Sequence, residues 1–180
     1  KRLMSEQTIQ DNLYSIPVTI LDKYTCLSLG ATTINDLIKT GKLKSVKASK
    51  NLSKKPDVLI INKNKEVVVF LEFKTPEELN TQAKIDKAIK QEISVAQEIG
   101  AKIYVVADGD KYIWLNPTTG NLITDENGTP IIRKIDPKAE PKKLAEFIDL
   151  VSLSVSSEND TILRLEDIDP TDLAKKLPAF

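Results

Sequence analysis

Two apolar runs joined by a short polar segment constrain the fold of this chain more than any other feature. Residues 58–61 and 67–73 are both rich in β-branched side chains, which favour strands. The segment between them, Asn-Lys-Asn-Lys at 62–65, is typical of a turn, because Asn tolerates left-handed backbone angles. The pattern predicts an antiparallel hairpin in which both strands are buried on two faces.

Periodicity and capping residues predict the elements on either side of this hairpin. The expected helices cover residues 32–40, 81–99 and 140–151, and the expected further strands cover a lysine-rich segment around Leu43 and Val46 and residues 102–107 and 111–115. The order of elements over the central part is α-β-β-β-α-β. We therefore expect an α/β fold with a central mixed β-sheet flanked by helices.

The chain length of 180 residues suits one domain with terminal extensions. We expect an N-terminal extension over residues 1–30, which looks helical in places before Pro17. The core domain is expected over residues 31–151, and a C-terminal extension or linker toward a further domain over 152–180.

The composition excludes large classes of chemistry. The chain has no histidine and one cysteine, Cys26, so it has no Ser-His-Asp triad, no Cys-His pair and no histidine-bearing zinc site. Its apolar runs are far shorter than the roughly 20 residues that span a bilayer, and its start does not resemble a signal peptide. We expect a cytoplasmic protein without membrane partners, whose catalysis would rest on carboxylates, lysines and a hard metal ion.

The charged residues at the ends of the hairpin suggest where such an ion could bind. With the turn centred on Asn64 and Lys65, Asp57 stands directly opposite Glu72, at a Cα separation of about 4.5–5.5 Å. Side chains alternate along a strand, so Glu72 and Lys74 share one face and Phe73 points to the other. Three charged groups should therefore converge at one end of the hairpin.

Two carboxylates this close repel each other unless a cation lies between them, and Mg²⁺ prefers a few protein oxygens together with several waters. Such an ion could bind a phosphate oxygen and a hydrolytic water, and Lys74 could orient that water and stabilise developing negative charge. Mn²⁺ could substitute for Mg²⁺. Each fragment alone is more often structural, because many strands end in Glu-x-Lys and many begin at an Asp that follows Pro. The combination of the two favours a metal site.

Lys55-Pro56-Asp57 followed by Glu72-Phe73-Lys74 resembles the PD-(D/E)xK signature of restriction-endonuclease-like nucleases, and the order of elements over residues 32–115 is similar to the core of that superfamily. The resemblance implies that Asp57 and Glu72 bind Mg²⁺ and that Lys74 assists the attacking water. It also makes the backbone carbonyl of Phe73 a candidate further ligand.

More narrowly, residues 30–137 resemble the N-terminal nuclease domain of type I restriction enzyme R subunits and of fused restriction-methylation enzymes. Relatives of this kind often carry a Gln-x-x-x-Tyr element on the helix after the E-x-K strand. Here Gln91 is the matching candidate catalytic residue, but Val95 stands where Tyr is expected. Asp36 is the nearest candidate for an acid on the first helix. Because those proteins are far longer, we expect this chain to be an excised domain.

Seven lysines lie between residues 39 and 55 with no acid among them, and such a run could contact a polyanion or could be a solvated face. The candidate DNA-binding residues are Lys47, Lys50, Lys54, Lys55 and, on the long helix, Lys87.

The sequence and this resemblance therefore predict a Mg²⁺-dependent endonuclease domain that hydrolyses DNA, the cleavage module of a restriction-modification enzyme with methyltransferase, specificity or motor partners. One alternative is a non-catalytic nucleic-acid-binding or assembly module that retains the nuclease fold. A third reading, an RNA or single-strand nuclease, would need exposed aromatic side chains, whereas Tyr104, Tyr112 and Trp114 more simply pack the core.

Overall fold

The computed structural model describes residues 18–28, 32–46 and 52–162 of the chain, and its framework is a six-stranded sheet. The strands are β1 (Val18–Ile20), β2 (Tyr24–Ser28), β3 (Val58–Asn62), β4 (Val67–Phe73), β5 (Ile103–Ala107) and β6 (Tyr112–Leu115). Their order in the sheet follows their order in the chain. The β4–β5 pair is parallel and the other neighbouring pairs are antiparallel, so the sheet is mixed, as predicted.

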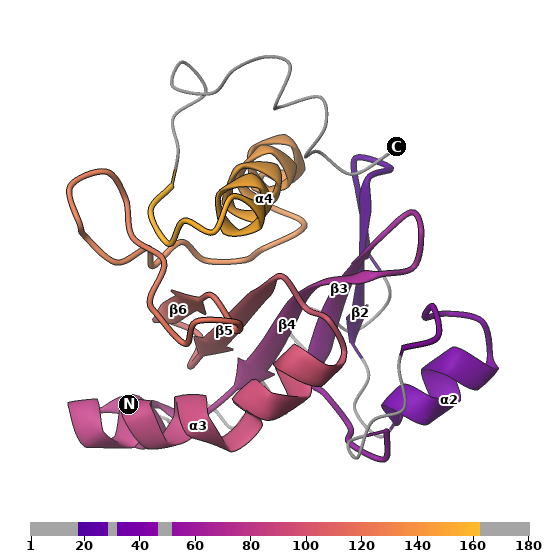
Figure 1. Ribbon diagram of the computed structural model, residues 1–180, viewed down its shortest axis with the longest axis horizontal. Coiled ribbons are helices and arrows are strands. Elements are labelled where there is room, and N and C mark those ends of the chain that lie inside the picture. Colours follow the sequence, from indigo (N-terminus) through magenta and orange to yellow (C-terminus); the bar gives the residue numbers. More distant parts are fainter. Residues whose placement is uncertain (1–17, 29–31, 47–51, 163–180) are drawn as a thin grey trace.

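Helices cover both faces of this sheet, which confirms the predicted α/β class (Figure 1). The helices are α2 (Ile34–Lys39), the short 3₁₀ helix η1 (Pro76–Leu79), α3 (Gln82–Glu98) and α4 (Pro141–Ser156). One apolar cluster joins α4 to the side chains on its face of the sheet, and the other joins α2 and α3 to the opposite face. The segment η1–α3 is the crossover that makes β4 and β5 parallel.

The helices predicted over residues 32–40 and 81–99 form close to their expected limits because their sequences carry suitable ends. Thr33 caps α2 by accepting a hydrogen bond from the backbone N–H of Asp36, and Thr81 caps α3 by accepting one from the N–H of Lys84. Gly100, with a φ of 73°, follows the end of α3.

The central hairpin has the predicted register at the end that carries the charged residues. Val58 stands opposite Leu71 and Leu59 opposite Phe70. Nearer the turn the register shifts between Ile60 and Ile61, which leaves Val68 as an extra residue in β4. In the turn itself, the residue with the left-handed backbone is Lys65, with a φ of 61°, rather than an Asn.

The prediction of a strand around Leu43 and Val46 is wrong. Leu43 is buried, but its backbone N–H bonds the carbonyl of Leu37 in the turn that follows α2, so the side chain packs beneath the helix rather than in the sheet. The place beside β3 is taken by β2, which precedes α2 in the chain.

The sheet and its helices include residues that precede residue 31 and residues that follow residue 151, the limits predicted for the core domain. The hairpin β1–β2 lies within residues 1–30, and its turn places Leu21 and Asp22 at φ values of 50° and 57°, typical of a tight strand-twisting turn. At the other end, α4 continues to Ser156. The stretch before Pro17 that looks helical in sequence lies outside the described residues. No helix in the described part of the chain is long and apolar enough to cross a membrane.

Candidate functional site

Asp57 and Glu72 lie together where β3 begins and β4 ends. The backbone N–H of Phe73 donates to Oδ2 of Asp57 at 2.8 Å, and the N–H of Asp57 approaches Oε1 of Glu72 at 3.4 Å. Each carboxylate thus accepts from the backbone of the other's strand. The hairpin brings the two acids into contact, as the register predicted, whereas their role as ligands stays a prediction.

Backbone pairing on both sides fixes the position of these two acids. The carbonyls of Leu52 and Lys54 accept from the amides of Asn35 and Ile34 at the start of α2, which anchors the segment that leads into Asp57. On the other side, the N–H of Lys74 donates to the carbonyl of Ala107 at 2.7 Å, which extends the β4–β5 pairing past Phe73. The site is therefore built on the rigid sheet rather than on a loop.

Glu72 is a carboxyl group held in an environment that disfavours its charge. Its exposed fraction is only 9%. Burial raises its pKa well above the ordinary value, and the neighbouring charge of Asp57 raises it further. A buried carboxyl group beside a second, half-buried one is stabilised either by a retained proton or by a cation that takes the place of the proton.

The oxygen donors fit a magnesium or manganese ion better than a zinc ion. Among the described residues there is no group of three His, Cys, Asp or Glu side chains that could hold a metal, so a closed zinc site of four protein ligands is not built here. Mg²⁺ instead keeps several waters and commonly uses one or two protein carboxylates. Asp57 and Glu72 match that smaller requirement. The Phe73 carbonyl stays a predicted further ligand.

Lys74 and Gln91 meet beside the acid pair. Nζ of Lys74 donates to Oε1 of Gln91 at 3.1 Å, which connects the end of β4 to α3. Lys74 is half-buried and Gln91 is exposed, so a substrate could reach both groups. The side chains of Phe70 and Phe73 belong to opposite apolar clusters, so Glu72 and Lys74 extend on the α3 face as alternation predicts.

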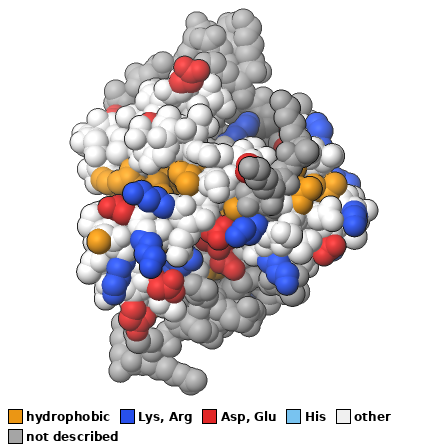
Figure 2. All heavy atoms as spheres, turned by 60° about the horizontal axis from the view of Figure 1, so that its bottom comes forward, with side chains coloured by type: hydrophobic (Ala, Val, Ile, Leu, Met, Phe, Trp, Pro, Cys, Tyr) orange, Lys and Arg blue, Asp and Glu red, His pale blue; other side chains and the backbone are white. Residues whose placement is uncertain are grey.

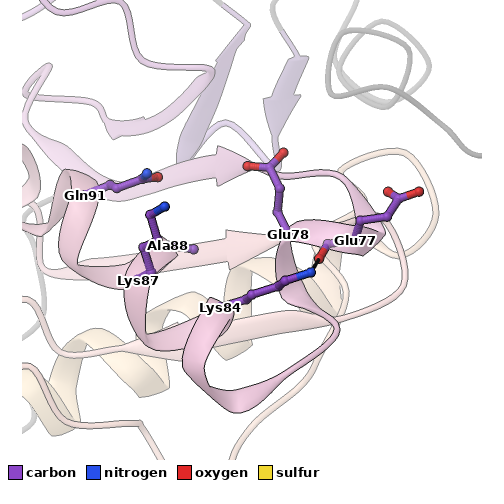
Figure 3. A pocket seen from close by; sticks show the side chains of 6 residues that line it. All are labelled: Glu77, Glu78, Lys84, Lys87, Ala88 and Gln91. Atoms are coloured by element: carbon purple, nitrogen blue, oxygen red, sulfur yellow. Dashed lines mark hydrogen bonds between the residues drawn. The ribbon is translucent and has the colours of Figure 1, made fainter.

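A pocket with a volume of about 250 Å³ lies next to Gln91, between η1 and α3. Figure 3 shows Gln91 and Lys87 of α3 on one side and Glu78 of η1 on the other. Lys84 is held by the backbone, because its Nζ donates to the carbonyl of Glu77 at 3.1 Å. The predicted DNA-binding residue Lys87 is thus exposed beside Gln91.

The other predicted DNA contacts are placed only in part. Lys54 and Lys55 are exposed immediately before the site, and Lys47 and Lys50 lie outside the described residues. Figure 2 shows the side covered by α3, where basic and acidic side chains are interspersed rather than separated. Asp36 is exposed in the first turn of α2, where its N–H is bonded to Thr33.

The three aromatic side chains weighed for stacking on bases are core residues. Tyr104, Tyr112 and Trp114 are all fully buried, which leaves no aromatic platform on β5 or β6. This agrees with the interpretation that they pack the core.

Sequence reasoning missed two groups near the acid pair. Glu92 is half-buried on α3, and its charge contributes to the raised pKa values of Glu72 and Tyr104. The signal was present, since Glu92 lies one helical turn from the buried residues Ala88 and Ala96, on the otherwise apolar face. Tyr104 was predicted only to pack the core, because the sequence pattern of a strand does not show which charged groups lie near a side-chain hydroxyl.

Comparison with known proteins adds one distant match. No family model and no curated protein matches the chain. One solved structure that matches is that of the type IIG restriction endonuclease BpuSI, at 15% sequence identity and a TM-score of 0.34. The match covers 68% of this chain but 15% of that chain, so this chain corresponds to a small part of the larger enzyme's length.

Proposed function

We propose that Asp57, Glu72 and Lys74 form the centre of a Mg²⁺-dependent endonuclease that hydrolyses DNA phosphodiester bonds. The observation that carries the proposal is the contact between Asp57 and Glu72 at the paired ends of β3 and β4. Glu72 is buried and Asp57 beside it is half-buried, so the two carboxyl groups need a cation or a proton, and Lys74 supplies the further group that phosphate chemistry uses.

Each residue has a distinct task in this mechanism. A bound Mg²⁺ would polarise the phosphoryl group and lower the pKa of its water. Asp57 and Glu72 hold the ion, and the sheet keeps their oxygens in place. Lys74 orients the water and donates to the phosphate, while its hydrogen bond to Gln91 holds the long side chain in one position. Mn²⁺ would substitute, because it prefers the same oxygen ligands.

The test is the nicking of supercoiled plasmid in the presence of Mg²⁺. We expect Asp57→Asn, Glu72→Gln and Lys74→Ala each to reduce the rate by at least about 100-fold, since removal of a group that stabilises transition-state charge has effects of that order. Lys63→Ala is the matched control, because Lys63 lies at the turn end of the same hairpin and is exposed. It should cleave at the wild-type rate. Full cleavage by Asp57→Asn protein with an unchanged circular dichroism spectrum would end the proposal.

The second candidate function is a non-catalytic nucleic-acid-binding or assembly module. It is favoured by Val95, which is buried where a tyrosine was expected, and by the mutual backbone hydrogen bonds that satisfy Asp57 and Glu72 without an ion. Calorimetric titration with Mn²⁺ separates the two. A module of this kind would bind DNA but no ion, and Glu72→Gln would leave its DNA affinity unchanged.

The proposed setting is a larger restriction-modification enzyme in the cytoplasm, in which methyltransferase, specificity and motor functions reside in other domains or subunits. The described surface near the site offers lysines for the DNA backbone, and phosphate contacts of that kind position a duplex without reading its sequence. Target recognition in this proposal is therefore supplied by those partners.

A further inference from the structure

Tyr104 carries a buried hydroxyl group that the packing of the core does not explain. The residue is fully buried in β5, and its hydroxyl has no hydrogen-bond partner among the described residues. Its ring is held edge-on against Phe70, with the centroids 5.6 Å apart. Buried polar groups in folded proteins nearly always have a hydrogen-bond partner, so a fully buried hydroxyl without one needs an explanation.

The hydroxyl belongs to the same face of the sheet as the acid pair. Tyr104 stands beside Phe70 in the parallel β4–β5 register, and Glu72 follows two residues further along β4 on the same face. Glu72, Glu92 and Asp57 all act electrostatically on the phenol, which, together with the larger effect of burial, raises the pKa of Tyr104. The group therefore keeps its proton and remains a hydrogen-bond donor near three carboxyl groups.

We propose that Tyr104 is a positioning residue of the metal centre, whose hydroxyl donates to the Glu72 carboxylate, directly or through one water, when that carboxylate holds the cation. The inference rests on the proposed function, because it needs the acid pair to hold an ion. Glu72 accepts from the backbone N–H of Asp57, and among the described residues the Tyr104 hydroxyl has no hydrogen-bond partner. A carboxylate that holds a metal ion is commonly oriented by a hydrogen-bond donor in a second layer around the ion, and the buried Tyr104 hydroxyl on the same face of the sheet is a group that can supply that donor.

The experiment measures ion binding without DNA, so that it does not depend on catalysis. Mn²⁺ is titrated calorimetrically into wild-type protein, Tyr104→Phe and Tyr112→Phe. Tyr112→Phe is the matched control, because it removes a hydroxyl from another fully buried tyrosine, one that belongs to the apolar cluster on the α4 face. We expect Tyr104→Phe to weaken Mn²⁺ binding by about tenfold or more, as the loss of groups that orient metal ligands does, and Tyr112→Phe to change it less than about twofold.

A second readout is the melting temperature with EDTA and with saturating Mn²⁺. Without the ion, Tyr104→Phe should be at least as stable as wild type, since it removes only an unpartnered buried hydroxyl. With the ion, its gain in melting temperature should be smaller than that of wild type.

The outcomes separate this inference from the proposed function. If wild type binds Mn²⁺, Glu72→Gln loses that binding and Tyr104→Phe binds as tightly as wild type, the tyrosine has no positioning role and the metal centre stands. An equal weakening in Tyr112→Phe would also overturn the inference, because it would show a general effect of losing a buried hydroxyl. If wild type binds no ion at all, both proposals fail.

Discussion

Glu72 is buried beside the carboxyl group of Asp57 and accepts a hydrogen bond from the backbone N–H of Asp57. Without a cation, its raised pKa means that the folded state binds a proton more tightly than the unfolded chain does. The folded protein therefore loses stability as the pH rises above the ordinary glutamate pKa of about 4.3 and through the raised pKa of Glu72.

The corresponding prediction concerns Glu72→Gln in EDTA. The amide keeps the size of the side chain and an oxygen that can accept from the backbone N–H of Asp57, but it carries no charge. We expect its melting temperature at pH 7–8 to exceed that of wild type by about 3 °C or more, and the difference to shrink toward pH 4. Glu66→Gln, at the exposed turn end of β4, should follow the wild-type profile. A wild-type melting temperature that rises relative to that of Glu72→Gln between pH 4 and pH 8 would contradict a raised pKa for Glu72.

Individual residues of the site also show which contacts the sequence could predict and which it could not. The pairing of Asp57 with Glu72 was predictable, because turn position and strand alternation fix which residues oppose each other. The approach of Glu92 and Tyr104 to the same point was not, because it depends on how α3 packs on β5. No spacing rule within one element encodes that packing.

At the scale of elements, local signals succeeded where composition and capping agreed. The helices α2 and α3 begin at capping threonines, and β3 to β6 are short β-branched or aromatic runs. The failure around Leu43 arose because one buried leucine looks the same in a strand and in a turn beneath a helix. The hairpin β1–β2 was not predicted, since its strands, VTI and YTCLS, mix polar with apolar residues and lack the continuous apolar runs of β3 to β5.

The link between the β1–β2 hairpin and α4 gives a prediction about stability. The hydroxyl of Tyr24 donates to Oδ1 of Asp149, and Nζ of Lys23 lies 2.8 Å from Oδ2 of the same side chain. Asp149 is largely buried, with 15% of its side chain exposed. We expect Tyr24→Phe to lower the free energy of unfolding in urea by about 1.5–3 kcal/mol, the range for hydrogen bonds to charged groups.

The matched comparison is the exposed ion pair of Lys63 with Asp22, whose side chains are 44% and 89% exposed. Lys63→Ala should change the free energy of unfolding by less than about 1 kcal/mol, because solvent screens such pairs. Equal effects of the two substitutions would show that Tyr24 does not tie the hairpin to α4.

At the scale of the whole molecule, the chain has 26 basic and 26 acidic residues, so any attraction for DNA depends on where charges lie rather than on their sum. Of the lysines predicted to contact DNA, the structure describes Lys54, Lys55 and Lys87, and all three are exposed. If they contact phosphates, each releases counterions when DNA binds.

We therefore predict the salt dependence of DNA binding, measured by fluorescence anisotropy in EDTA. Each of Lys54→Ala, Lys55→Ala and Lys87→Ala should reduce the slope of log affinity against log salt by about 0.9. Lys138→Ala is the control, because this exposed lysine precedes α4, on the opposite face of the sheet. Unchanged slopes for all three site lysines, or an equal reduction for Lys138→Ala, would place the DNA elsewhere.

The central claim is that two acids distant in the sequence hold one divalent ion together. It is tested most directly by the anomalous difference map of a crystal soaked in Mn²⁺. We predict one peak bonded to carboxylate oxygens of both Asp57 and Glu72, and no peak at that place in crystals of Glu72→Gln. A wild-type map without a peak there, with the two carboxyl groups still joined to each other, would contradict the account.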